Sequence, residues 1–410
     1  MTTRLDLFDP GFVQAPYPWL ARLRQEAPVH FDPRTGLWVV SRYRDVRHVL
    51  LDTACFRPDN AQTAVTALSL PALRVLAKAG FSLPPALADN SGPNHKALRR
   101  LTAGYFSADR VAAAARVTEE TAARLLQGIG RNLDRGQPGD LVADYAHILP
   151  RLVMMHVLGV RGVDPATLGR WSDDALELFW GRPSPERQVT LAESVAQFHR
   201  WLSDRVSAGS VEQDDLIGAL SRHLRQDGTP LDPATAVAVC FFVLIAGQST
   251  TGQLIATVLR RALEAPETWA RAGRERGFAE AWVEETLRIE PPVTSWRRIT
   301  ACEVELGGVR LPAGSPLLLM LMSAGTDPDV FERPQQMCPR RANVRRHLAF
   351  GTGPHRCPGA SMARMEAATA LRSAARALPR AVAATGDTPV PMLGLLSFRA
   401  PLHLPVFSGR

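Results

Sequence analysis

The sequence lacks the features of secreted, membrane-spanning and disulfide-stabilised proteins. Its N-terminus has no basic start followed by an apolar run, so it does not resemble a signal peptide. The longest apolar stretch, residues 236–247, has 12 residues, which is too few to cross a bilayer. The five cysteines form no paired framework, which fits a reducing compartment. We therefore expect a cytoplasmic protein with no membrane association.

Lysine and aromatic residues are also scarce. Lys78 and Lys96 are the only lysines, so almost all of the 48 basic residues are arginines, and the net charge is +8. Aromatic residues make up only 7% of the chain, and no stripe of alternating basic and aromatic residues occurs. We therefore expect no nucleic-acid partner, and the positive charge favours an acidic protein partner instead.

What is present is mainly helical periodicity. Apolar residues recur at helical spacing over 111–128 and 191–208, and a long Ala-, Val- and Leu-rich segment covers 234–263, with Asp232 or Thr229 as a possible cap. Strand patterns are confined to 29–41, 302–321 and 397–407. No linker or internal repeat divides the chain. The sequence predicts a mainly α protein, with a single domain over residues 1–410 and small β-sheets near both ends, and we expect a monomer.

One cysteine lies in an unusually constrained loop, FGTGPHRCPG, at residues 350–359. Three glycines allow positive φ angles and close backbone approach, and two prolines stiffen the chain around Cys357. A helix-forming run follows from Ala360, and His355 and Arg356 add positive charge, so the loop favours a thiolate. A small buried apolar cysteine is the simplest alternative. Zinc binding is disfavoured because there is no CxxC, and a cysteine hydrolase needs a positioned histidine that we do not identify.

The loop resembles the F-G-x-G-x-H-x-C-x-G motif of the cytochrome P450 haem-thiolate monooxygenases, with every fixed position present. These positions are Phe350, Gly351, Gly353, His355, Cys357 and Gly359. The resemblance implies the cytochrome P450 fold, and a haem b group whose iron is bound by the Cys357 thiolate, an electron-rich ligand that favours cleavage of the O–O bond. It also implies O2 as a substrate and electrons from a separate redox partner.

Two further family motifs follow from the same resemblance. Glu285 and Arg288 form a helical E-x-x-R pair, which alone would be an ordinary surface pair, and the resemblance joins them to Arg341 in a buried structural cluster. His95 and Arg99 share one face of a predicted helix and match the H-x-x-x-R motif that binds haem carboxylates. A solvated basic face is the alternative reading of that helix.

Additional haem contacts are implied at Arg298, with Arg297 as the alternative, and at His355.

The segment FFVLIAGQSTTGQLIA, residues 241–256, matches the distal helix of the family. The family pattern is [Ala/Gly]-Gly-x-[Asp/Glu]-Thr-[Thr/Ser], so Ala246 contacts the haem and Thr250 falls on the oxygen-activating threonine. Ser249 stands where the family has an acid. A serine hydroxyl passes a proton but cannot titrate near neutral pH. We expect Gln248, Ser249 and Thr250 to act in catalysis, with waters or a substrate group completing the proton relay, or with an altered reaction.

Substrate contacts are predicted from less specific segments. Residues 63–90 carry few charges and are expected to cover the pocket, although a surface helix and loop would look similar. Apolar residues are expected to line its walls, which indicates a lipophilic, medium-to-large substrate such as a polyketide, a terpenoid or a carrier-bound intermediate. The expected wall residues are Phe242, Val243, Ala246, Val293, Thr294, Leu395 and Leu396.

The chain has no flavin or nicotinamide fingerprint, so electrons are expected from a ferredoxin and its ferredoxin reductase. Arginines near the cysteine side of the haem would bind an acidic ferredoxin, unless they are part of a generally arginine-rich surface. The arginines in question are Arg100, Arg345, Arg346, Arg356 and Arg364.

The resemblance therefore implies a monooxygenase that hydroxylates or epoxidises a secondary metabolite. Two alternatives stay open at this point. Ser249 makes an atypical outcome plausible, such as desaturation, ring formation, coupling or peroxide-driven oxidation. A non-catalytic haem sensor is the other alternative, and the retained Thr250 argues against it.

Overall fold

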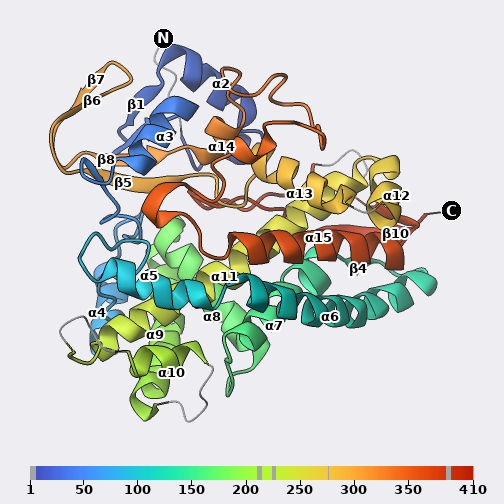
Figure 1. The fold of residues 1–410 in the computed structure, drawn as a ribbon, viewed down its shortest axis with the longest axis horizontal. Helices are drawn as coiled ribbons and strands as arrows, with labels where there is room; N and C mark the ends of the chain where they lie inside the picture. The colour runs from blue at the N-terminus through green and yellow to red at the C-terminus, as the bar shows by residue number, and fades with distance from the viewer. Residues whose placement is uncertain (1–5, 210–214, 224–227, 276, 385–388, 410) are drawn as a thin grey trace.

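The structure, a computed structural model, describes residues 6–209, 215–223, 228–275, 277–384 and 389–409. Helices form most of it (Figure 1). This confirms the predicted mainly α fold. The α-helices of these residues are α1 (Pro10–Gln14), α2 (Tyr17–Glu26), α3 (Tyr43–Leu51), α4 (Leu70–Lys78), α5 (His95–Gly104), α6 (Ala108–Asp134), α7 (Ile148–Val157), α8 (Pro165–Trp180), α9 (Pro185–Ala208), α10 (Leu216–Ser221), α11 (Pro233–Leu263), α12 (Pro266–Arg274), α13 (Phe278–Ile289), α14 (Leu321–Gly325) and α15 (Ala360–Ala377).

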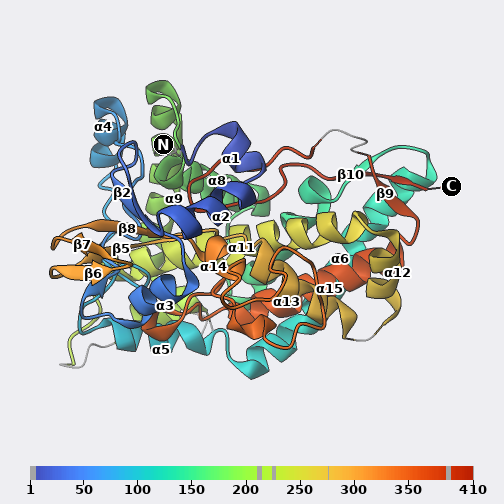
Figure 2. The ribbon, with the colours of Figure 1, turned by 90° about the horizontal axis from the view of Figure 1, so that it is seen from above.

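The strands form three sheets. The largest has the order β1-β2-β8-β5-β3, the second β4-β10-β9, and the third is the hairpin β6-β7. Their bounds are β1 (Val29–Asp32), β2 (Leu37–Val40), β3 (Phe56–Arg57), β4 (Gly139–Asp140), β5 (Trp296–Thr300), β6 (Val304–Leu306), β7 (Val309–Leu311), β8 (Pro316–Leu319), β9 (Ala381–Ala383) and β10 (Pro405–Ser408). The five-stranded sheet and the β6-β7 hairpin lie at one end of the long helices, and the β4-β10-β9 sheet lies near the C-terminus at the other end (Figures 1 and 2).

The three predicted strand segments are each divided further in the structure. Residues 29–41 form the antiparallel pair β1 and β2, and residues 302–321 contain β6, β7 and β8. The hairpin β6-β7 turns at Gly307 and Gly308, which both have positive φ. The last segment, 397–407, is a strand only from Pro405 onwards, because earlier residues make isolated bridges to the chain around Val293 and Met392.

The largest sheet joins the N-terminal hairpin to a strand far along the chain. Strand β2 pairs in parallel with β8, and β8 pairs antiparallel with β5. The two faces of β8 are both buried: Leu317 and Leu319 pack in one apolar cluster, and Leu318 packs in another. Burial on both faces explains why this strand is continuously apolar and shows no alternation.

Helix α11 runs through the centre of the molecule (Figures 1 and 2). It begins where Asp232 caps the amide of Ala234, with Pro233 in the first turn, where its missing N–H costs nothing. Its length and composition would allow it to cross a membrane, but two-thirds of the apolar window is buried inside the protein. A buried core helix meets the same criterion, so α11 is weak evidence for membrane insertion.

A buried ion cluster connects α11, α13 and the C-terminal segment. Glu290, which follows α13, is fully buried and lies 2.6 Å from both Arg260 and Arg261 of α11. Arg399 lies 3.0 Å from the other carboxylate oxygen. Burial alone would raise the pKa of Glu290, but the three arginines outweigh it and lower that pKa to about 2.

We predict that Glu290→Gln changes the pH dependence of stability. The pKa of Glu290 is about 2 in the folded chain against 4.5 for a free side chain, so its carboxylate stabilises the fold above pH 4.5. That contribution is lost as the pH falls from 4.5 towards 2, at about 1.4 kcal/mol per pH unit. Denaturant unfolding should therefore show the free-energy difference between wild type and Glu290→Gln shrinking over this window.

The matched control for this prediction is Glu264→Gln. Glu264 is half-exposed and contacts Arg260 from the surface. Its replacement should leave the pH profile of the wild type almost unchanged. A constant difference between wild type and Glu290→Gln down to pH 3 would contradict the assigned pKa.

Candidate functional site

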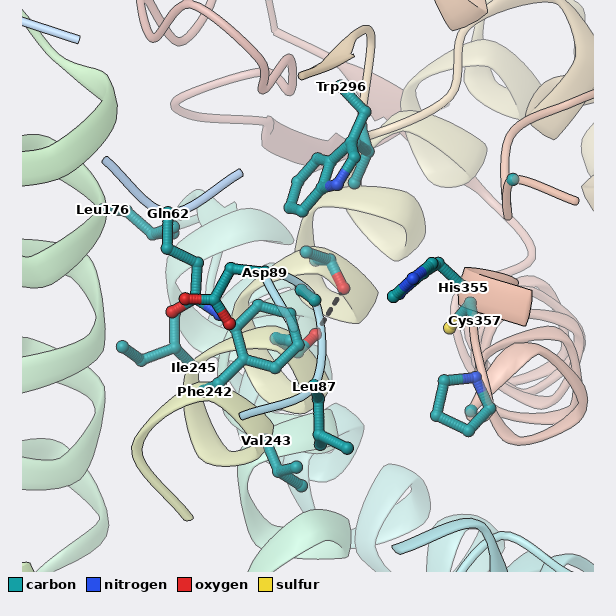
Figure 3. A pocket seen from close by; sticks show the side chains of 18 of the residues that line it. Gln62, Leu87, Asp89, Leu176, Phe242, Val243, Ile245, Trp296, His355 and Cys357 are labelled. Atoms are coloured by element: carbon teal, nitrogen blue, oxygen red, sulfur yellow. Dashed lines mark hydrogen bonds between the residues drawn. The ribbon is translucent and has the colours of Figure 1, made fainter. Parts of the chain in front are cut away.

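A cavity of about 740 Å³ lies between α11 and the cysteine loop. Figure 3 shows Cys357 and His355 on one side of it, with Phe242, Val243 and Ile245 of α11 on the other. Most of its lining is apolar. Such a cavity, with few polar groups, is typical of a binding site for a lipophilic molecule.

The cysteine loop is held in a tight turn by its own backbone. Gly351 and Gly353 have φ angles of 65° and 73°, a region that side-chain-bearing residues rarely adopt. The amide of Cys357 donates to the carbonyl of Phe350 over 2.9 Å, which closes the turn. Helix α15 begins directly afterwards at Ala360, so the thiol lies at a helix N-terminus and receives the Gly359 amide.

The electrostatics of the thiol differ from the expectation that the loop keeps it ionised. Burial is the largest influence and raises the pKa of Cys357. The Gly359 amide and the charges of Arg99 and Arg356 lower this pKa but do not outweigh burial. Cys357 is exposed towards the cavity, while the protein atoms packed around the rest of the residue favour a neutral thiol. A cation bound in the cavity would favour the thiolate instead.

Two arginines reach the cavity beside Cys357 without a carboxylate partner in the described part of the chain. Arg298 is 1% exposed, and its guanidinium contacts only the carbonyl of Arg297, which leaves its Nε without a partner. Arg99 donates to the carbonyl of Arg356. Burial lowers the pKa of Arg298 to about 10. A buried cation is costly unless an anion compensates it, so Arg298 indicates an anionic ligand, and the partly buried Arg99 adds a second positive charge beside it.

Two histidines complete this group. The rings of His95 and His355 stack with their centroids 4.3 Å apart, and each has one buried ring nitrogen without a partner, Nε2 in His95 and Nδ1 in His355. Burial lowers both pKa values, that of His355 to about 4. His95, which the sequence motif assigns to binding a haem carboxylate, is thus a neutral imidazole that donates one N–H and not a cation. Arg297, the alternative to Arg298, points elsewhere: it does not line the cavity and donates to the carbonyl of Ala61.

The distal wall is formed by α11. Ala246 and Thr250 line the cavity, and the Thr250 hydroxyl donates to the Ala246 carbonyl over 2.5 Å. Gly247 allows α7 to pack closely, since a Cβ there would lie 2.3 Å from Met154 Cε. Gln248 and Ser249 do not line the cavity. The Gln248 side chain instead donates to Ser172 of α8, so it is directed away from the cavity, whereas the sequence placed it in catalysis.

The side walls match the sequence predictions only in part. Phe242, Val243 and Val293 line the cavity, whereas Thr294, Leu395 and Leu396 do not. Phe398 replaces the last two, because it forms a bridge opposite Val293 and thereby faces inward. The segment 63–90 covers the cavity as expected, with α4 packed on α9 through Ser69, whose amide donates to Gln188.

Several cavity residues were missed in the sequence. The carboxylate of Asp89 accepts from the amide nitrogen of Gln62 over 3.3 Å, and together they form a polar end of the cavity (Figure 3). Glu366 of α15 is fully buried, lines the cavity and has no hydrogen-bond partner for either carboxyl oxygen. Burial raises its pKa well above the usual range.

Comparisons with known proteins agree with this geometry. A family model described as Cytochrome P450 matches residues 187–376. The cyclomarin C epoxidase CymV of Salinispora arenicola is 32% identical over 366 residues, which cover 86% of each chain. The chain belongs to the cytochrome P450 family.

Other relatives support the enzymatic class. The erythromycin C-12 hydroxylase of Saccharopolyspora erythraea is 31% identical over 86% of this chain and 84% of its own. The solved structure of cytochrome P450 CREJ in complex with (4-ethylphenyl) dihydrogen phosphate superposes with a TM-score of 0.91 at 29% identity, and covers 97% of this chain and 98% of its own. The chain is thus a P450 monooxygenase with the P450 fold.

The residues of this P450 fit a haem group. Haem carries two carboxylates, and the unpaired guanidinium of Arg298, Arg99 and the two partnerless histidine nitrogens supply donors for them. Iron is the cation that would ionise the thiol of Cys357. Among the described residues no group of three or more His, Cys, Asp or Glu could hold a metal ion.

The E-x-x-R pair of this P450 lies in a buried cluster. Arg288 and Glu285 are both fully buried and joined by two hydrogen bonds of 2.7 and 2.9 Å. Arg341 lies 3.0 Å from the same carboxylate, which also accepts the amide of Cys338. Arg288 further donates to three backbone carbonyls in the region that precedes the cysteine loop. The cluster therefore fixes that region to α13.

We predict that Glu285→Gln destabilises the fold by about 3–5 kcal/mol, because it leaves two buried guanidinium groups without their carboxylate. The measurement is denaturant unfolding of the purified protein. The matched control is Glu303→Gln, which removes the partner of Arg310 at the surface, where both side chains are more than half exposed. It should cost less than about 1 kcal/mol. Similar losses in both variants would contradict a structural role for the cluster.

Proposed function

We propose that this P450 is a cytoplasmic haem-thiolate monooxygenase of secondary metabolism that hydroxylates or epoxidises a lipophilic natural product. The single observation that carries the proposal is the apolar cavity, which has Cys357 at its base and Thr250 on the facing wall. The names of two relatives, a cyclomarin C epoxidase and an erythromycin C-12 hydroxylase, support this substrate class.

The chain's own residues would hold the haem in a defined orientation. When bound, the haem supplies the centre at which O2 is reduced and one oxygen atom is transferred. Cys357 would bind the iron, and Arg99, Arg298, His95 and His355 would bind the two carboxylates. Phe350, Gly351 and Gly359 lie along the cysteine side of the same cavity. These contacts would hold the group between the loop and Ala246 of α11.

Substrate would bind in the part of the cavity between α11 and the covering segment. Phe242, Val243 and Trp296 provide apolar contact, which excludes water from the reacting atoms. Asp89 and Gln62 supply a polar end, and Asp59 lines the cavity nearby. An otherwise lipophilic substrate with a hydroxyl or amine that donates to Asp89 fits this arrangement. A buried polar contact of this kind orients the substrate more than it increases affinity.

Thr250 would hold a proton at its hydroxyl beside the site of O2 reduction. Its hydroxyl already donates to Ala246, and a hydroxyl can donate one hydrogen bond while accepting two. A donor from the solvent side can therefore reach the Thr250 oxygen and pass a proton through it.

Electrons would come from a small acidic ferredoxin and its reductase. Arg100, Arg345, Arg346 and Arg356 are exposed and supply positive charge around the cysteine side. Arg364, the fifth arginine expected there, is instead bound to the buried carboxylate of Glu284 over 2.7 Å. We therefore omit Arg364 from the docking surface, since its charge is already neutralised.

The decisive experiment for the proposed function replaces the thiolate ligand. Wild-type protein should contain haem, and its reduced, CO-bound form should show the red-shifted absorption of a thiolate ligand. Cys357→Ala should lose that absorption and lose product formation with ferredoxin, its reductase and candidate macrolide or peptide substrates. Cys338→Ala is the matched control and should retain both. Wild-type protein without haem, or Cys357→Ala with an unchanged spectrum, would refute the proposal.

We further predict that Thr250→Ala uncouples electron use from product formation. Without the hydroxyl, protons reach the reaction less selectively, so peroxide release should rise and product per electron should fall several-fold. Thr250→Ser keeps the hydroxyl and should retain most of the coupling. Peroxide and product measured against electron consumption test this, and full coupling in Thr250→Ala would show that the hydroxyl has no such role.

A further inference from the structure

The distal helix contains no acidic residue. Helix α11 extends over 31 residues, and none of them is Asp or Glu. Beside the cavity it offers only the hydroxyls of Ser249, Thr250 and Thr251, which pass protons but do not titrate near neutral pH. Monooxygenation consumes two protons and two electrons for each O2: one oxygen atom enters the substrate and the other leaves as water. A titratable group must therefore come from another element.

Helix α8 presents such a group directly opposite Ser249. Two successive residues of α11 face two successive residues of α8. Gln248 donates to the Ser172 hydroxyl over 2.6 Å. The next residue of α11, Ser249, has its hydroxyl close enough to the Asp173 carboxyl group to lower the pKa of that group. Arg151 of α7 donates to the oxygen of Gln248 and also acts on Asp173 through its charge. The contact thus belongs to a polar layer between α7, α8 and α11.

The surroundings of Asp173 suit exchange of protons with the solvent. The residue is exposed, so water reaches it, yet enough protein surrounds its carboxyl group that burial raises its pKa from 3.8 to about 6. Arg151 and the Ser249 hydroxyl oppose this shift, and Asp174 adds to it. Asp174 is itself bound to Ser194 and lies 3.5 Å from Arg187, both on α9. Contact with water moderates this shift. Because the pKa of Asp173 is raised, its carboxyl group titrates closer to neutral pH than a free aspartate does.

We propose that Asp173 supplies protons to the distal side of the cavity through Ser249, so that the acid missing from α11 is provided by α8. The inference rests on the proposed monooxygenase function. In this relay the protonated Asp173 carboxyl gives its proton to Ser249 Oγ, while Ser249 releases its own proton towards Thr250 Oγ1. Thr250 then turns its hydroxyl away from the Ala246 carbonyl and releases that proton into the cavity. Asp173 then takes a new proton from solvent. Ser249 is thereby the positioning residue between the carboxylate and the hydroxyl that lines the cavity.

Glu366 is the competing source of protons. It lines the cavity and has no partner, but it is fully buried and belongs to α15, which also follows the cysteine loop. It therefore has no direct contact with solvent from which to be reprotonated. Asp173 has both the solvent contact and the contact with the residue next to Thr250.

The experiment compares Asp173→Asn, Ser249→Ala and the double variant in the haem-containing enzyme. Each single variant should lower product per electron several-fold, raise peroxide release and flatten the pH profile of coupling between about pH 5 and pH 7. The solvent isotope effect should increase in both. The double variant should be no worse than either single one, because both interrupt one path. Adding Ser249→Asp to Asp173→Asn should restore coupling, since it places a carboxyl group on α11.

Asp174→Asn is the matched control. It removes the neighbouring carboxylate, which is bound to α9 and not to Ser249. Coupling and isotope effect should stay at wild-type values. A loss in Asp174→Asn equal to that in Asp173→Asn would mean that α8 acts only through general charge, which overturns the relay.

A second readout does not depend on turnover. Difference infrared spectra of wild type minus Asp173→Asn should show a carboxyl C=O band that titrates above the usual pH range of an aspartate. In Ser249→Ala this band should titrate at higher pH, because the serine hydroxyl stabilises the charged form. Absence of any shift would refute the Ser249 contact.

The outcomes separate this proposal from the proposed function. Wild-type protein without haem or product would refute the function. An active, coupled wild type whose Asp173→Asn variant is unchanged would refute only the relay. Loss of coupling in Glu366→Gln together with normal Asp173→Asn would transfer the role to Glu366.

Discussion

The site depends on one constraint, which is that the thiol of Cys357 lies at the base of a largely apolar cavity at the start of α15. The turn that holds it requires two glycines with positive φ and the hydrogen bond from the Cys357 amide to Phe350. In this position burial outweighs the helix N-terminus and the nearby arginines, so the protein favours a neutral thiol. The iron of the haem would supply the positive charge that stabilises the thiolate. Binding of the haem and ionisation of Cys357 would therefore occur together.

Some buried charges are neutralised by other residues of the protein, and others need a bound ligand to neutralise them. Glu285 and Glu290 are fully buried, and each is surrounded by arginines that neutralise it within the protein. Arg298 is buried to the same degree, but its guanidinium finds only a backbone carbonyl. The first arrangement stabilises the fold. The second is costly without an anion, and the haem carboxylates would provide one.

A polar layer behind the distal wall combines groups from three helices. Helix α11 contributes the hydroxyls and the close packing at Gly247, α7 contributes Arg151, and α8 contributes Asp173. A serine in the position of the family's acid therefore does not leave this region without a carboxylate. Ser249 replaces the family's acid on α11, and α8 carries the carboxylate of Asp173 nearby. This arrangement depends on how the two helices pack and not on a local sequence motif.

The sequence alone determined the fold class, the cysteine loop and the motifs around Glu285 and His95, because these depend on short spacings within one helix or loop. It also placed α11 and gave Asp232 or Thr229 as its cap, between which the structure decides for Asp232. Tertiary structure alone decided which side chains meet. Phe398 lies in the cavity and Leu395 does not, since a bridge to Val293 sets the direction of that segment. Gln248 turns to Ser172, and Asp173 meets Ser249, because the packing of α8 on α11 brings together residues that share no local pattern.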